Sequence, residues 1–242
     1  MSIAVISDIH GNLEALTAVL RDIKDREVES IHCLGDVIGY GCDPRACLQL
    51  VEDNCDTKLI GNHEYVLMGK SSIEQCNPSA QESFKWTQLE LNDYDMALIE
   101  KYEMQRSIGD VLFIHASTYN PEEWHYIVDR EQAGRAFNHL DQSVCFFGHS
   151  HLPTIFLEMP NELPRIKIGH DFLMDADQRY LINVGSVGQP RDNDPRASYV
   201  VADTDTGDVY FNRVEYDVKT TQDKMARARL PKILIERLSA GR

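Results

Sequence analysis

The sequence predicts one α/β domain made of two packed β-sheets and their helices. Over the first 60 residues, strand-like apolar runs alternate with helical segments three times, which is typical of parallel strands joined by right-handed crossovers. After residue 151 the chain has the pattern of short strands separated by turn residues. The sequence contains no low-complexity linker and no internal repeat, so we assign residues 1–242 to a single domain.

The N-terminal quarter consists of three strand-and-helix units. Asn12 is placed to cap a helix over residues 13–25, and Pro44 suits the first turn of a helix over residues 45–53. The strands are expected at residues 2–7, 30–34 and 57–60.

Residues 64–104 are expected to form a helical insert, because Asn77 and Asn92 are capping residues followed by apolar residues at helical spacing. The C-terminal end, from about residue 220, resembles a helical tail.

The region between the insert and the tail is expected to be mainly strands. Gly109 and Asp110 form the turn of a predicted hairpin over residues 106–116, and a helix is expected over residues 129–140. The further strands are expected at residues 143–147, 154–159, 165–168, 179–184, 197–203 and 208–216.

The net charge of the chain disfavours some classes of binding partner. With 39 acidic and 24 basic residues, the net charge of −15 argues against a sequence-independent grip on a nucleic-acid polymer. An anionic substrate would then need a local positive charge such as a bound metal. No apolar run approaches the roughly 20 residues that span a bilayer, and the first residues lack a signal-type leader, so we expect a cytoplasmic protein with no membrane partner. The six cysteines form no CxxC pair and are expected to be free thiols.

Residues of metal-ligand type follow successive strand-like runs. In open α/β sheets, ligands bind beyond the carboxyl ends of the strands, so these side chains are expected to meet in one crevice. They are Asp8 and His10 after the first run, Asp36 after the second, Asn62 and His63 after the third, His115 after residues 111–114, and His149 and His151 after residues 143–147.

The histidine pair in CFFGHSHLP raises a specific expectation. In an extended chain alternate side chains share a face, so His149 and His151 would lie on one side and reach two neighbouring metal ions. Gly148 would let the backbone pass close to such a site without a Cβ.

Each of these motifs alone has a simpler explanation. Asp8 can be a turn residue, Asp36 can belong to an ordinary loop, and a single histidine such as His115 is more often structural than a ligand. Their conjunction, each just after a strand-like run, is what favours a metal site.

The ordered set D-x-H, G-D-x-x-G, G-N-H-E, a lone H and G-H-x-H resembles the calcineurin-like metallophosphoesterase superfamily. The stretches GDVIGYGCDPRACL and INVGSVGQPRDNDPRASYVV resemble its small bacterial and archaeal YfcE-like branch of predicted phosphodiesterases. The resemblance extends from residue 3 to about residue 215.

The resemblance implies a four-layer αββα sandwich of two mixed β-sheets that carries two divalent metal ions. Asp36 would bridge the two ions, and His63 would lie near the phosphate. The implied ligands are Asp8, His10, Asp36 and His151 for one ion, and Asp36, Asn62, His115 and His149 for the other.

Two such ions would clamp a phosphoryl group, and a water bridging them would become the nucleophile. The oxygen and nitrogen donors suit Mn²⁺, Fe, Co, Ni or Zn²⁺, and we favour Mn²⁺ because carboxylate and amide oxygens are prominent. His63 would stabilise charge on a phosphate oxygen and protonate the leaving group, and Asp8 would assist by anchoring it or through an indirect hydrogen bond.

Substrate contacts are expected from Asn62 and His63 and from three further side chains. Arg191 suits bidentate phosphate recognition, or it forms a structural salt bridge with a neighbouring aspartate. Arg45 points into the crevice or lies on a solvated helix face, and Tyr40 stacks on a base or packs its loop. The aromatic loop over residues 119–125 is either a pocket wall for a leaving group or a small hydrophobic cluster.

The substrate is expected to be a small phosphoester. The β-rich second half of the chain also offers strand edges through which a homo-oligomer could form. The second motif, GDVIGYG, lacks the Asp-Arg-Gly of protein Ser/Thr phosphatases, so a small diester, a nucleotide or a dinucleoside polyphosphate is favoured over a phosphoprotein. A non-catalytic metal-binding scaffold of the same fold is less favoured because all eight motif positions are present, and the motif order does not indicate a di-metal peptidase or amidase.

Overall fold

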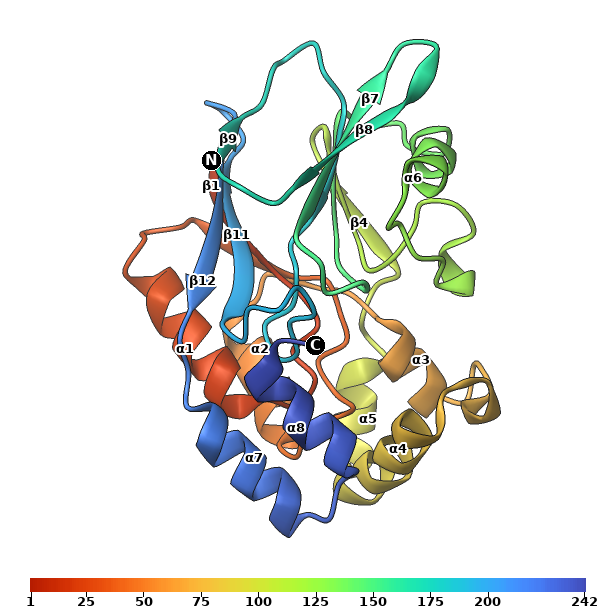
Figure 1. Cartoon of the computed structure of the whole chain (residues 1–242), viewed down its shortest axis with the longest axis vertical. Helices are drawn as coiled ribbons and strands as arrows, with labels where there is room; N and C mark the ends of the chain where they lie inside the picture. Colours follow the sequence, from red (N-terminus) through yellow and green to blue (C-terminus); the bar gives the residue numbers. More distant parts are fainter.

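The computed structural model describes the backbone of residues 1–242 and every side chain except that of Gln75. Across these residues, two six-stranded mixed sheets pack face to face and helices cover both outer faces (Figure 1). The predicted four-layer αββα sandwich is therefore confirmed.

The first sheet contains the N-terminal strands. Its order is β3 (Thr57–Lys58), β2 (Ser30–Cys33), β1 (Ser2–Ile6), β11 (Ala197–Asp203), β12 (Asp208–Val214) and β9 (Phe172–Leu173). β1, β2 and β3 are parallel as predicted, and the other pairs are antiparallel. β3 is shorter than expected because the next residue, Leu59, forms an isolated bridge with Glu103, and the two-residue β9 was not predicted.

The second sheet is formed by the middle of the chain. Its order is β4 (Gln105–Ile108), β5 (Val111–Ile114), β6 (Val144–Phe147), β10 (Tyr180–Asn183), β7 (Thr154–Met159) and β8 (Glu162–Ile168). The predicted β4–β5 hairpin is confirmed, and its Gly109 has a φ of +57°, a conformation that glycine adopts without steric cost.

Side-chain alternation along the strands separates the layers. In β1, Ile3 and Val5 pack against the second sheet, whereas Ala4 and Ile6 pack against helices. The helices on that outer face are α1 (Leu13–Lys24), which Asn12 caps as predicted, and α2 (Pro44–Asn54). α6 (Arg130–Phe137) covers the outer face of the second sheet. Strands buried on both faces explain the nearly continuous apolar runs in the sequence.

The remaining helices gather at one end of the molecule (Figure 1). Residues 62–99 contain α3 (Asn62–Leu67), the 3₁₀ turn η1 (Ile73–Gln75), α4 (Pro78–Glu90) and α5 (Asp93–Ile99); a second 3₁₀ turn, η2 (Pro121–Glu123), follows β5. The C-terminal segment forms two helices, α7 (Val218–Arg227) and α8 (Lys232–Ala240), because Pro231, which has no N–H to donate, starts a new helix.

The C-terminal helices pack onto the helices of residues 62–99. Phe84 of α4, Met225 of α7 and Leu234 and Leu238 of α8 share one apolar cluster with Tyr40, which lies in the loop after β2. The helices of residues 62–99 and the C-terminal helices therefore meet over that loop. All six cysteines are free thiols, as expected. Over the residues that the structure describes, no helix combines the length and apolarity that crossing a membrane requires.

His32, which the motifs leave out, has a structural role. Its ring is buried in β2, stacks on Phe113 at 4.3 Å, and hydrogen-bonds Thr57 Oγ1 at 2.9 Å and Ser30 Oγ at 3.0 Å. Burial lowers the pKa of His32 from 6.5 to about 4.

This pKa predicts a pH-dependent stability. Since the unfolded chain takes up the proton first, stability should fall as the pH drops through the window from about 6.5 to about 4. Between pH 7 and pH 5, His32 should lower the free energy of unfolding by about 2 kcal/mol. Urea unfolding should show that His32→Gln loses less stability over this interval than wild type. The exposed His170 provides the control, His170→Gln; parallel pH profiles for all three proteins would contradict the prediction.

Candidate metal centre

The predicted ligands converge at the ends of strands from both sheets. Their ligand atoms form three overlapping buried groups, each with all atoms within 4.8 Å of one another. The groups are Asp8, His10 and His151; His10, Asp36 and His63; and Asp36, His115 and His149. The shared members, His10 and Asp36, join the three groups into one cluster. We call this cluster, with Asn62 added, the metal centre.

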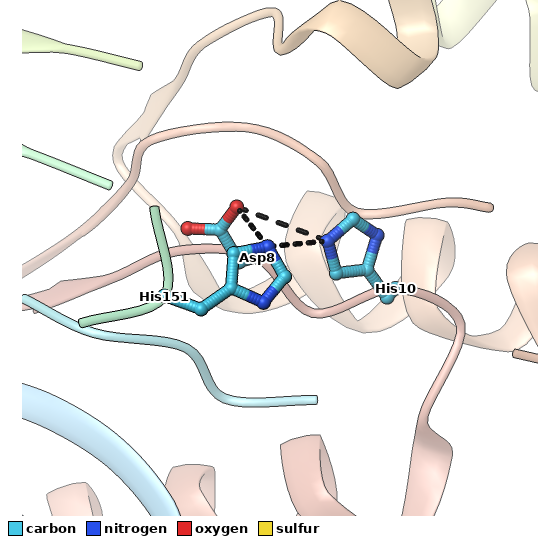
Figure 2. Close-up of side chains that lie close together, drawn as sticks. All are labelled: Asp8, His10 and His151. Atoms are coloured by element: carbon cyan, nitrogen blue, oxygen red, sulfur yellow. Dashed lines mark hydrogen bonds and ion pairs between the residues drawn. The ribbon is translucent and has the colours of Figure 1, made fainter. Parts of the chain in front are cut away.

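The first group is a compact triad (Figure 2). Asp8 Oδ1 lies 3.2 Å from His151 Nε2 and 3.8 Å from His10 Nε2. The two Nε2 atoms lie 3.1 Å apart. Figure 2 shows that the carboxylate and both rings turn these atoms toward one point.

Asp36 connects the two sides of the centre through a single oxygen. Its Oδ2 lies 3.5 Å from His115 Nε2, 3.7 Å from His10 Nε2 and 3.8 Å from His63 Nε2. His115 belongs with His149 on one side, and His10 belongs with His151 on the other. One carboxylate oxygen is therefore within reach of positions on both sides.

Backbone carbonyls set the tautomers of three histidines. A carbonyl oxygen can only accept, so each Nδ1 must carry a proton, and in the neutral ring Nε2 then presents its lone pair to the centre. The Nδ1 atoms of His10, His115 and His151 donate to the carbonyls of Ile38 (3.2 Å), Leu34 (3.0 Å) and Gln189 (2.6 Å). The lone pairs of His10 and His151 then face each other, an arrangement that repels unless a cation lies between them.

Metal-ligand atoms that lack a hydrogen-bond partner also fit a bound cation. Four buried atoms of the predicted metal ligands have no hydrogen-bond partner among the described residues: Asp8 Oδ1, Asn62 Oδ1, His115 Nε2 and His149 Nε2. Buried polar atoms without partners are costly, and these four are ligand atoms for divalent metals. The residues present therefore fit a metal centre with oxygen and nitrogen donors.

Each carboxylate has one oxygen held by the backbone. The backbone N–H of His149 donates to Asp8 Oδ2 and that of His63 donates to Asp36 Oδ1, both at 2.9 Å. Burial alone would raise the pKa of both carboxyls, but the surrounding histidines outweigh it and hold the pKa of Asp8 and Asp36 below the ordinary value. Both side chains are therefore ionised at neutral pH.

Most imidazoles of the centre are neutral. Burial lowers the pKa of His10, that of His149 to about 3 and that of His63 to about 4. Burial also acts to lower the pKa of His115, but the carboxylates of Asp36 and Asp8 outweigh it and raise the pKa to about 9. A cation beside His115 would take the place of this proton.

The backbone of the centre is strained. Asp8, His10, Asp36, His149 and His151 have φ values of +55°, +50°, +52°, +65° and +61°. This left-handed conformation costs a non-glycine residue roughly 1–2 kcal/mol. The expectation of an extended segment at the two G-H-x-H histidines is therefore wrong, because the chain bends at both residues. The bend directs His149 and His151 to different groups of the centre.

Gly148 has the role that the sequence predicted. A Cβ at this position would lie 2.1 Å from Ser7 Oγ and 2.5 Å from Asp8 Oδ2. Only glycine lets the G-H-x-H loop approach the ligand Asp8 so closely.

Glu64, the last residue of G-N-H-E, is a residue that the sequence analysis missed. Its buried carboxylate accepts the backbone N–H groups of Asp36 (2.9 Å), Val37 (2.8 Å), Ile38 (3.1 Å) and Gly61 (2.8 Å). Burial and the neighbouring Asp36 raise the pKa of Glu64 to about 7, while these donors favour the ionised form. Glu64 thus fixes the loop after β2 to the start of α3.

His63 lies between the centre and an aromatic wall. Its ring centroid is 4.5 Å from Tyr40 and 4.6 Å from Phe84. Contrary to expectation, the carboxylate that contacts His63 belongs to Asp36, whereas Asp8 contacts His10 and His151. The predicted anchoring of His63 by Asp8 is therefore wrong.

Arg191 lies beside the centre, and Arg45 does not. The backbone N–H of Arg191 donates to the carbonyl of His151 at 3.3 Å, and its guanidinium lies 5.9 Å from the centroid of the Tyr40 ring. Arg45 instead pairs with Asp95 at the start of α5 through a 2.8 Å contact, with its side chain 55% exposed. The expected substrate contact of Arg45 is corrected accordingly, because its guanidinium serves an ion pair between helices.

The aromatic loop after β5 flanks the other side. Tyr126, which the sequence analysis missed, stacks on His149 at 4.2 Å, and Trp124 meets His115 edge-on at 5.9 Å. Tyr119, Trp124, His125 and Tyr126 line a cavity of about 370 Å³. The pocket-wall interpretation of this loop is therefore favoured over a closed hydrophobic cluster.

Comparison with known proteins gives consistent matches. A family model described as a calcineurin-like phosphoesterase superfamily domain matches residues 1–207. The protein MJ0912 of Methanocaldococcus jannaschii is 41% identical over 245 residues, covering 99% of this chain and 98% of that protein. The crystal structure of a metallophosphoesterase from Sphaerobacter thermophilus has 39% identity and a TM-score of 0.88, covering 100% of this chain and 99% of that chain. The structure of PH1004 from Pyrococcus horikoshii OT3, with 20% identity and a TM-score of 0.80 over 100% and 98% of the two chains, shares the fold.

The contacts of Glu64 predict a large stability effect. Glu64→Gln keeps one acceptor oxygen and turns an amide N–H₂ toward backbone donors, so we expect the free energy of unfolding to fall by about 2–4 kcal/mol. Urea unfolding measures this loss. Glu162→Gln, at an exposed position of β8, is the matched control. If both variants were equally stable, Glu64 would not support the centre as described.

Proposed function

This chain belongs to the calcineurin-like phosphoesterase superfamily, and from that premise we propose that it hydrolyses a phosphodiester or phosphomonoester bond of a small substrate with two divalent ions. It is a metal-dependent phosphoric ester hydrolase, a metallophosphoesterase. The observation that carries the proposal is the position of Asp36 Oδ2, which faces ligand groups on both sides of the centre.

The proposed ligands follow the three groups of the centre. One ion would be held by Asp8, His10, Asp36 and His151, and the other by Asp36, Asn62, His115 and His149. The facing Nε2 lone pairs and the unpartnered oxygens support this assignment. We favour Mn²⁺ because two carboxylates and an amide oxygen are among the donors; Fe, Co, Ni and Zn²⁺ also fit. When bound, the ions would neutralise phosphate charge and lower the pKa of bound water.

His63 has the position of a substrate contact. It lies against Asp36 and is held by Tyr40 and Phe84, so its orientation is defined before substrate binds. An anionic phosphate beside the ring would raise the pKa of His63 from its depressed value and favour proton donation to the leaving group. Arg191, next to His151, would bind a phosphate oxygen.

The surroundings favour a small substrate. His10, His63, His115 and His151 are buried, and Tyr126 stacks over His149, which leaves little room for a protein surface to reach the centre. The cavity beside Tyr126 offers aromatic faces to a leaving group such as a nucleobase. We therefore propose a nucleotide, a small diester or a dinucleoside polyphosphate as the substrate class.

A direct assay tests the proposed activity. Metal-free protein would be incubated with bis-p-nitrophenyl phosphate and p-nitrophenyl phosphate in the presence of Mn²⁺, Ni²⁺, Co²⁺ or Mg²⁺. We expect metal-dependent release of nitrophenol. A folded protein that hydrolyses neither ester nor a panel of nucleotides with any of these metals would favour a non-catalytic scaffold.

The bridging position predicts the result of removing one charge. Asp36→Asn should disturb both ions, because one carboxylate oxygen serves both sides of the centre. Metal analysis after equilibrium dialysis should find fewer than two ions per chain. Retention of two ions with unchanged affinity would contradict the bridge.

Removing the His63 side chain should affect turnover rather than metal binding. His63→Ala should keep the metal content of the wild type, because His63 belongs to neither proposed ligand set, and should lower kcat by about 10²–10⁴-fold. Steady-state kinetics and metal analysis on the same preparation distinguish the two roles. Loss of metal with an unchanged rate per bound ion pair would make His63 a ligand.

A further inference from the structure

Asn183 is a buried asparagine that does not belong to the metal centre. It is the last residue of β10, and its side chain has no exposed surface. In the second sheet it lies opposite Phe147, the last residue of β6, so it stands where the G-H-x-H loop (residues 148–151) begins. An amide buried at this depth needs hydrogen-bond partners within the protein.

Three partners fix the amide of Asn183. Its Nδ2 donates to the carbonyl of Gly148 at 2.6 Å and to Ser150 Oγ at 3.0 Å, and its Oδ1 accepts the N–H of Gly185 at 2.9 Å. Because a carbonyl can only accept and a backbone N–H can only donate, the amide fits in one orientation. Asn183 therefore holds the residue before His149 and the residue after it.

The segment that Asn183 holds is a strained turn. The N–H of Ser150 donates to the carbonyl of Gly148 at 2.7 Å, and His149 between them has a φ of +65°. A three-residue turn with this hydrogen bond and a positive central φ is the rare, strained form of the γ-turn. Such a conformation persists only where surrounding contacts hold it, and Asn183 provides two of these contacts.

The γ-turn places two predicted metal ligands. The backbone N–H of His149 donates to Asp8 Oδ2 at 2.9 Å, and the His149 side chain belongs to the group of Asp36. His151, two residues later, belongs to the group of Asp8. Straightening the turn would withdraw the N–H from Asp8 and move the His149 ring relative to Asp36.

The His149 ring lacks the hydrogen bond that orients other histidines of the centre. His10, His115 and His151 each donate from Nδ1 to a backbone carbonyl. Among the described residues, His149 Nε2 has no partner, and the ring is held by stacking on Tyr126 at 4.2 Å. Its position therefore depends more on the backbone turn than the positions of the other three rings do.

We propose that Asn183 is a positioning residue for the metal ligand His149. By holding the γ-turn, it keeps the His149 imidazole within the ligand set of one ion. Asn183 acts through the backbone, so it sets the affinity of the centre for metal and takes no part in the reaction itself. This inference rests on the proposed function, whose ligand set it uses.

Metal affinity tests this role. Asn183→Asp has nearly the same shape but turns an oxygen instead of Nδ2 toward the Gly148 carbonyl. In equilibrium dialysis against Mn²⁺, the dissociation constant of at least one ion should rise by about 10–100-fold. Asn212→Asp is the matched control, because Asn212 is a buried asparagine of β12 that donates to the carbonyl of Tyr210 at 3.1 Å and belongs to no group of the centre. Equal affinity in the two variants would overturn the inference.

Turnover separates positioning from a general loss of stability. With bis-p-nitrophenyl phosphate, Asn183→Asp should lose rate at the Mn²⁺ concentration that just saturates wild type and should regain most of kcat in excess Mn²⁺, because every ligand is still present. His149→Ala, which removes the ligand, should not recover. A rate that stays low in excess Mn²⁺ while the Mn²⁺ affinity is unchanged would make Asn183 a purely structural residue and overturn the inference.

The dialysis also separates this inference from the proposed function, because it requires no turnover. Weaker Mn²⁺ binding by Asn183→Asp than by Asn212→Asp supports the inference even if wild type hydrolyses no ester, and a wild type that binds no Mn²⁺ overturns both proposals. Ser150→Ala removes one contact of Nδ2 and keeps every ligand, so it should weaken binding by a smaller factor. If Asn183→Asp does not fold, Ser150→Ala decides in its place, and wild-type affinity in that variant overturns the inference.

Discussion

The structure depends on keeping buried carboxylate oxygens and imidazole nitrogens close together in the metal centre. Asp8 and Asp36 bring two negative charges into the interior, and the Nε2 atoms of His10 and His151 face each other at 3.1 Å. Without a cation such an arrangement opposes folding, because lone pairs repel and buried charges lose their hydration. Bound divalent ions would turn the same contacts into favourable ones, so metal binding and stability of this region are coupled.

The fold keeps this unfavourable set in place through backbone contacts. Backbone N–H groups hold one oxygen of each carboxylate, carbonyls hold the Nδ1 atoms, and Glu64 gathers four N–H groups beneath Asp36. Five residues of the centre remain in the left-handed conformation, at a cost of roughly 1–2 kcal/mol each. The apolar layers between and outside the two sheets offset these costs, which is why the ligands sit at strand ends and the strands themselves are apolar.

The metal centre and the outer part of the site come from different regions of the chain. Every proposed metal ligand lies within residues 8–151, whereas Arg191 follows β10 and α8 is the last helix of the chain. Tyr40 touches both parts, since it contacts His10 and His63 and packs with Leu234 of α8. Tyr40 is therefore a contact shared by the metal centre and the C-terminal helices.

The sequence alone determined the layer architecture, nearly all strands and helices, and the metal-ligand residue types. These features depend on local periodicity, capping residues such as Asn12, and the position of polar residues just after apolar runs. It did not determine the bend at His149 and His151, the role of Glu64, or the ion pair of Arg45 with Asp95. Each of these depends on contacts between residues far apart in the chain, and a local pattern does not specify which distant partner a loop or helix end will meet. The tertiary structure decided them because backbone strain and ion pairing are settled only when the sheets and C-terminal helices pack together.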